Sequence, residues 1–133
     1  MPATQSADDV VEVYRVEHRT DGSGPYNPRG ADAPRMFRMA EEHQDENHPG
    51  PYEGGEFDFP FDLRDDHFFG FQSLDLLTAW FDGWLAKLDA AGYRVATYRV
   101  PADAVVLGRH QCVFERERAL SKPRRVRMDR LSN

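Results

Sequence analysis

The strongest constraint on the fold is an apolar stripe between Phe68 and Gly92, in the sequence FFGFQSLDLLTAWFDGWLAKLDAAG. Ser73 can cap the start of a helix there, and Gly92 can end it in the left-handed conformation. We therefore expect one dominant helix over about residues 73–91, with one side buried in the core. The bulky side chains recur at spacings that place them on that side of a 3.6-residue helix: Leu74, Leu77, Trp80, Phe81, Trp84, Leu85 and Leu88.

Short segments typical of β-strands lie on both sides of this helix, because apolar residues alternate with polar ones or form brief runs. Asp32 and Pro34 predict the start of a short second helix over about residues 34–43. The pattern favours an α+β domain in which a mostly antiparallel sheet packs on the dominant helix. The predicted strands are residues 9–18, 67–71, 93–100, 105–107 and 111–115.

The chain has 133 residues and 40% hydrophobic content, which favours one domain with its own core. We expect residues 1–8 to be disordered, residues 9–118 to form the domain, and residues 119–133 to form a basic C-terminal strand or tail. The single cysteine, Cys112, lies in an apolar segment and predicts a buried, inert thiol in the reducing cytoplasm. We expect no membrane span, because no apolar run approaches the roughly eighteen residues that one requires.

The formal net charge of −6 conceals two opposed blocks. From Arg109 onward the chain has eight Lys and Arg but three Asp and Glu, whereas residues 41–66 hold ten carboxylates and one Arg. These blocks either neutralise each other in the fold or serve different partners, and both alternatives stay open.

A long acidic loop is predicted over residues 44–66, because this segment combines prolines, glycines and carboxylates without a sustained period. Its aromatic side chains are too apolar for a free linker, so we expect them to hold the loop against the domain. Acidic and aromatic side chains together favour docking on a protein partner with a basic surface. The candidate partner-binding residues are Tyr52, Glu53, Glu56, Phe57, Asp58, Phe59 and Asp62.

Two acidic and histidine-containing clusters are weaker candidates for chemistry. Asp65, Asp66 and His67 could act as an acid/base group, but adjacent charged residues before a strand are usually exposed. The other cluster comprises His43, Asp45, Glu46, His48 and His67. Its spacing matches no HExxH or Cys-His framework, so we expect a solvated loop and no metal site.

The basic C-terminal segment raises the question of nucleic-acid binding. Clustered cations attract phosphates, but this segment lacks the aromatic residues that stack on bases. We therefore expect this segment to be a basic edge that neutralises the acidic loop or keeps a terminal strand soluble. The cluster still leaves nucleic-acid binding open as an alternative. Its cations are Arg116, Arg118, Lys122, Arg124, Arg125, Arg127 and Arg130.

Three motifs occur in the order of a known catalytic series. They are Arg15 in VYRVEH, Ser73 in FFGFQSLDLLTAWF, and Glu115 and Glu117 in QCVFERE. This order resembles the arginine, serine and glutamate series of the ADP-ribosyltransferase-like fold. The resemblance implies that Arg15 holds a phosphate of NAD, that Ser73 supports the ribose, and that one glutamate stabilises the transition state. It departs from the family because no Ser-Thr-Ser run is present and because the glutamates follow an apolar strand segment instead of opening one.

The strings YRVEH, NHPGP and FGFQSLDLLTAWF also resemble small uncharacterised proteins of actinobacteria and their phages. Two hypotheses follow. The first is a phage-encoded accessory protein without a cofactor, which binds a protein partner through the acidic loop. The second is an active or degenerate NAD-binding transferase whose pocket lies between the first strand, the loop of residues 20–30 and the end of the segment 111–117.

Overall fold

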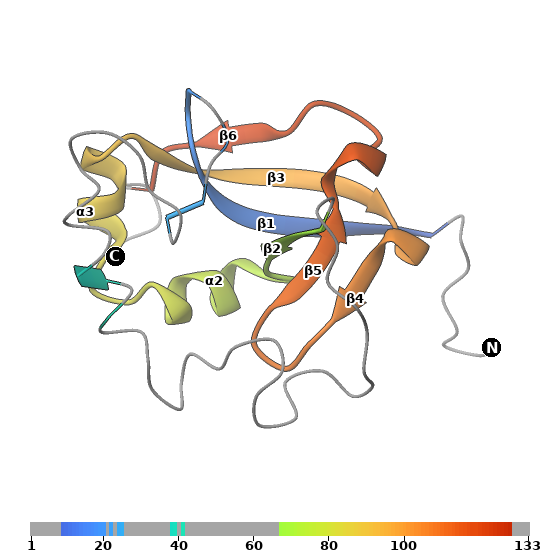
Figure 1. Ribbon diagram of the computed structural model, residues 1–133, viewed down its shortest axis with the longest axis horizontal. Coiled ribbons are helices and arrows are strands. Elements are labelled where there is room, and N and C mark those ends of the chain that lie inside the picture. Colours follow the sequence, from blue (N-terminus) through green and yellow to red (C-terminus); the bar gives the residue numbers. More distant parts are fainter. Residues whose placement is uncertain are drawn as a thin grey trace.

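The computed structural model describes residues 9–20, 22, 24–25, 38–39, 41 and 67–128 of the chain. Antiparallel sheets and short helices give the predicted α+β class (Figure 1). The helices of the main body are α2 (Leu74–Trp80), α3 (Leu85–Ala90), η1 (Ala102–Ala104) and η2 (Arg116–Arg118). The strands are β1 (Val10–His18), β2 (His67–Gly70), β3 (Tyr93–Pro101), β4 (Val105–Leu107), β5 (Cys112–Glu115) and β6 (Arg124–Val126).

The strands form two three-stranded antiparallel sheets, where the sequence predicted one. In the first sheet, of order β1-β3-β6, strands β1 and β3 pair from Val10 opposite Pro101 to His18 opposite Tyr93. The second sheet has the order β2-β5-β4. Figure 1 shows α2 and α3 along one side of the first sheet and the second sheet packed across one end.

A close backbone contact joins the two sheets. Tyr14 and Phe71 exchange two hydrogen bonds, with N···O distances of 2.8 and 2.7 Å. A Cβ atom on neighbouring Gly70 would lie 2.6 Å from Cγ1 of Val13, so this approach requires glycine.

The prediction of one continuous helix over residues 73–91 is wrong. The chain turns at Phe81–Trp84 between α2 and α3, and Gly83 adopts a positive φ of 83° there. The predicted ends are correct, because the Ser73 hydroxyl accepts a hydrogen bond from Leu76 N and Gly92 has a φ of 94°.

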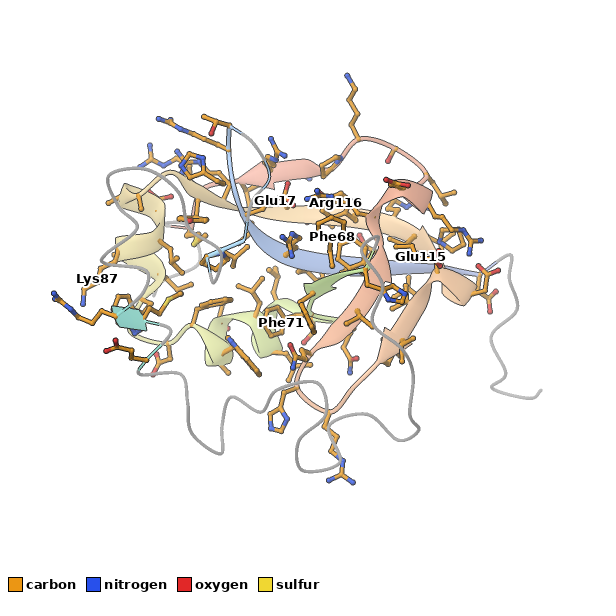
Figure 2. The ribbon with its side chains drawn as sticks, viewed as in Figure 1. Glu17, Phe68, Phe71, Lys87, Glu115 and Arg116 are labelled. Atoms are coloured by element: carbon orange, nitrogen blue, oxygen red, sulfur yellow. The ribbon has the colours of Figure 1, made fainter. Side chains whose placement is uncertain are left out.

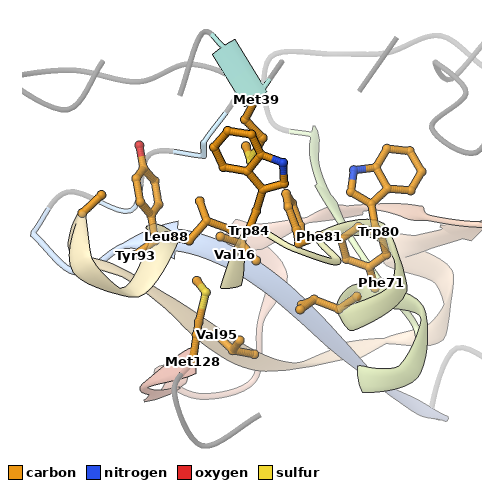
Figure 3. Packing of buried hydrophobic residues seen from close by; sticks show 12 residues of the cluster. Val16, Met39, Phe71, Trp80, Phe81, Trp84, Leu88, Tyr93, Val95 and Met128 are labelled. Carbon is orange, nitrogen blue, oxygen red and sulfur yellow. The ribbon is translucent and has the colours of Figure 1, made fainter. Parts of the chain in front are cut away.

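The turn between the helices keeps the apolar stripe in the core (Figure 3). Trp80 and Trp84 are only 8% and 7% exposed, and Leu77 and Leu88 are fully buried. Leu74 departs from the prediction, because it starts α2 and is 36% exposed. Phe71 contacts both Trp80 and Phe81 at ring-centroid distances of 5.5 and 5.9 Å. The core therefore contains the two tryptophans even though the helix is broken.

The predicted helix over residues 34–43 is described only at Arg38, Met39 and Glu41, which are helical. Met39 is fully buried and packs in the same core cluster as the tryptophans. The other residues of that helix, the predicted disordered residues 1–8 and the predicted acidic loop 44–66 lie outside the described part of the chain.

A second core cluster lies between the sheets and includes Val13, Tyr98, Cys112 and Phe114. Cys112 is fully buried, as the sequence predicted, and burial raises the pKa of its thiol to about 12. The helices in the described ranges are all too short or too polar to cross a bilayer.

Candidate functional site

The centre of the candidate site is Glu17, a fully buried carboxylate near the end of β1. The Tyr98 hydroxyl on β3 donates a 2.7 Å hydrogen bond to Oε1 of Glu17. Arg125 on β6 donates to Oε2 from Nε at 3.1 Å and from Nη2 at 2.6 Å. Each strand of the first sheet therefore supplies one member of this buried network.

Two further arginines approach the same carboxylate. Nε of Arg15 lies 3.2 Å from Oε1 of Glu17, and Nη1 of Arg116 lies 3.6 Å from it. Arg15 is 8% exposed, and burial lowers its pKa although Glu17 opposes this shift. Hydrogen bonding to Glu17 instead raises the pKa of Arg125, which lies at the surface. One buried carboxylate thus orders three guanidinium groups.

The Phe68 ring on β2 contacts two of these arginines. Its ring centroid lies 3.8 Å from Cζ of Arg116 and 5.2 Å from Cζ of Arg15, and Figure 2 shows Phe68 beside Arg116. Arg116 also donates a 3.1 Å hydrogen bond to the Gly22 carbonyl. Gly22 has a φ of 73°, and a Cβ atom there would lie 3.2 Å from Nη1 of Arg116. These contacts fix the orientation of the Arg116 side chain.

A cavity of about 430 Å³ opens beside this network. Its cationic lining comes from Arg116 of η2, Lys122 and Arg125 of β6. The Tyr98 pKa is raised to about 12, first by burial and then by the hydrogen bond to Glu17. The hydroxyl is therefore neutral at pH 7, and the cavity carries an excess of positive charge. The remaining lining residues are Gly22, Tyr98, Ala119, Ser121 and Pro123.

The four predicted catalytic residues occupy different environments. Arg15 belongs to the Glu17 network and donates a 2.8 Å hydrogen bond to the Phe69 carbonyl. The Ser73 hydroxyl caps α2, and it shares no hydrogen bond with Arg15 in the described part of the chain. Glu115 forms a 3.5 Å ion pair with Arg118, whereas Glu117 is exposed on η2. The structure thus brings Arg15 and Arg116, which directly follows β5, to the same carboxylate, and it gives Ser73 a structural role.

The predicted partner-binding residues lie outside the described residues: Tyr52, Glu53, Glu56, Phe57, Asp58, Phe59 and Asp62. Of the histidine-rich cluster, only His67 is described. The described ranges hold no group of three or more His, Cys, Asp or Glu side chains that could ligate a metal ion.

The basic C-terminal segment pairs with acids of the domain body. Besides the bonds from Arg125 to Glu17, Arg127 donates a 2.9 Å hydrogen bond to the buried Asp89 of α3. Arg118 donates at 2.8 Å to Asp103 of η1. Residues 124–126 of this segment form a strand that pairs with β3.

Sequence reasoning missed Glu17 and Tyr98 as members of the site. A signal was present, because Glu17 shares a strand face with Val13 and Arg15, both of which are buried. A carboxylate on a buried face requires a cation or hydrogen-bond donors, and the sequence does not show which residues supply them.

No curated protein and no solved structure matches this chain. The likeness to ADP-ribosyltransferases therefore stays a prediction. A family model described as "Bacteriophage T4 Y00F protein" matches residues 11–128, which include the strands and helices of the main body except Val10, the first residue of β1. The chain therefore belongs to the bacteriophage T4 Y00F protein family.

Proposed function

We propose that this protein is a phage-encoded accessory protein that acts by binding an acidic protein partner on the face formed by η2, residues 119–123 and β6. The family supports the phage origin. The observation that carries the proposal is the excess of positive charge beside Glu17, where Lys122 and the oriented side chains of Arg116 and Arg125 line one cavity. Pre-oriented cations at a surface favour association with an acidic partner and lower the entropy lost on binding.

The contacts of the predicted catalytic residues also favour a binding role. Arg15 holds Glu17 and the Phe69 carbonyl, and Ser73 caps α2. Glu115 pairs with Arg118, which is itself held by Asp103. These interactions stabilise the fold, so the same side chains would have to leave them to act on a substrate.

A charge-reversal experiment tests the binding role. The tagged protein captures partners from host lysate at low and at high salt, beside a Lys122→Glu, Arg124→Glu double variant and an Arg109→Glu control. Lys122 and Arg124 are exposed on the proposed face, whereas Arg109 is exposed in the turn between β4 and β5. We expect the unmodified protein to capture an acidic protein that is released at high salt. The double variant should fail to capture it, and the Arg109→Glu control should capture it normally. Equal capture by all three proteins would refute the proposed face.

The second candidate function is NAD binding in an ADP-ribosyltransferase-like pocket. One observation favours it. Gly22 contacts Arg116, and a Cβ atom on Gly24 would lie 3.1 Å from Nη2 of Arg15. The first strand, the loop after it and η2, which follows β5, therefore lie close together, and this proximity supports the candidate.

An assay of NAD hydrolysis with Glu115→Gln and Glu117→Gln variants tests this candidate. Turnover that one substitution abolishes would support a transferase. Turnover that neither substitution changes, or no turnover together with no NAD binding, would exclude it.

A further inference from the structure

We propose that the cavity between η2 and β6 is a binding site for a phosphate monoester, a compact group with up to two negative charges. This inference rests on the proposed function and deepens it, because it names the chemical group that the basic face recognises. The cavity of about 430 Å³ is lined by three cations, Arg116, Lys122 and Arg125.

The buried carboxylate does not cancel this positive charge. Glu17 accepts hydrogen bonds from Tyr98 and Arg125 and pairs with Arg15 from within the protein. Its oxygens are thus directed at protein donors, and one negative charge is shared among three guanidinium groups. With Lys122, the cations around the site exceed the carboxylate by three charges. A dianion therefore suits the site better than a single carboxylate does.

Arg116 is already held in one orientation for such a ligand. Its guanidinium group stacks on Phe68 at 3.8 Å, and Nη1 is directed at the Gly22 carbonyl and at Glu17. Nη1 donates to the Gly22 carbonyl, and Arg116 also shares a side-chain hydrogen bond with Tyr98. The Arg116 side chain is 28% exposed, and a guanidinium group can present a forked pair of donors to two phosphate oxygens. Because the side chain is fixed before binding, little rotamer entropy is lost.

Lys122 supplies the mobile charge of the site. It lies in the segment between η2 and β6, lines the cavity and is exposed. An ammonium group on a flexible stem acts as a point charge that can close on a phosphate. The Ser121 hydroxyl, also in the lining, adds a neutral donor.

A single phosphate group fits this open cavity better than a nucleic-acid backbone does. A backbone needs a row of cations and aromatic platforms for bases, whereas residues 116–128 contain no aromatic side chain. Arg127 on the same segment is turned to the buried Asp89. Three cations thus converge on this one cavity: Arg116, Lys122 and Arg125.

Titration of the full chain with inorganic phosphate tests the proposal, followed by calorimetry and by amide and Arg Nε–H chemical shifts. Three variants accompany the unmodified protein: Lys122→Ala, Arg116→Lys and, as the matched control, Arg124→Ala. Arg124 is exposed on β6 but does not line the cavity. We expect saturable binding that Lys122→Ala and Arg116→Lys each weaken about tenfold, and that Arg124→Ala changes less than about twofold.

Several outcomes separate this site from general charge attraction. Arg116→Lys keeps the charge, so unchanged affinity in that variant would overturn the forked recognition and the proposal with it. Equal weakening by Arg124→Ala and Lys122→Ala, or a linear response without saturation, would likewise overturn it. Tighter binding of an oligonucleotide without a terminal phosphate than of inorganic phosphate would replace it with backbone binding.

Two monoesters distinguish the source of the phosphate. Preference for O-phosphoserine supports a phosphorylated protein partner, and preference for a nucleoside 5′-monophosphate supports a free nucleotide. If phosphate does not bind but the lysate partner still depends on Lys122 and Arg124, this inference fails and the proposed function stands. If phosphate binds and no acidic partner is captured, the proposed function fails instead.

Discussion

Nη2 of Arg125 lies 2.6 Å from Oε2 of Glu17, although 108 positions separate the two residues in the chain. The ion pair fastens β6 to β1 across the intervening β3. The short strand β6 pairs with β3 at three positions, and the ion pair adds a side-chain contact to these backbone pairs. The buried acid and the C-terminal cations therefore form a structural unit.

Replacement of Glu17 by glutamine should destabilise the protein strongly. The substitution leaves Arg15, which is 8% exposed, without its buried counter-charge, and we expect a loss of about 3 kcal/mol in the free energy of unfolding. Urea denaturation measures the change. Glu12→Gln is the control, because Glu12 is exposed on the same strand. This substitution should lower the free energy of unfolding by less than about 0.5 kcal/mol. Equal effects of the two substitutions would contradict the role given to the buried pair.

Tyr98 should make stability fall at alkaline pH. Its pKa is about 12 in the folded protein and close to its ordinary value of 10 in the unfolded chain. The folded state therefore holds the proton more tightly, and this contribution is complete below pH 10 and is lost as the pH rises to about 12. We expect the difference in the free energy of unfolding between the unmodified protein and a Tyr98→Phe variant to shrink across that interval. A constant difference between the two unfolding free energies would show that the hydroxyl titrates normally.

Gly83→Ala should destabilise the protein by about 1 kcal/mol, because an L side chain is strained at a φ of 83°. No neighbouring atom lies within 4 Å of the added Cβ, so the backbone alone determines the cost. Thermal unfolding and far-ultraviolet circular dichroism measure the result, with the exposed neighbour change Asp82→Ala as control. A gain in both helicity and stability would indicate one continuous helix in place of α2 and α3.

Cys112 should resist alkylation in the native protein. The thiol is fully buried and its pKa is about 12, so almost no thiolate is present at pH 8. Iodoacetamide should modify it only when denaturant opens the domain, as mass spectrometry would show. Modification at the same rate with and without denaturant would place the thiol at the surface.

Local patterns in the sequence predicted the strands and the class of the fold correctly. Alternation along residues 9–18 and 93–100 gives β1 and β3, because side chains alternate across a sheet. The turn at Phe81–Trp84 was missed, since the apolar spacing continues through it and all three of Trp80, Phe81 and Trp84 stay buried. Gly83 was the local sign of the break, but glycine also occurs within helices.

The candidate site was predictable only in part. Arg15 was singled out and does belong to it, whereas Ser73 is explained by its cap. Alternation can place Glu17 on a face of β1, but it cannot show that Tyr98 and Arg125 cover that face. Such partners depend on tertiary structure, which brings together groups that no short motif connects.

The long separation between Glu17 and its cations has a consequence for synthesis. A nascent chain exposes this carboxylate to water from the start, and β3 follows only after most of the chain has been made. Arg116 and Arg125 emerge later still. The first sheet therefore closes after translation of nearly the whole domain, and C-terminal truncation before β6 should leave β1 with an acid that resists burial.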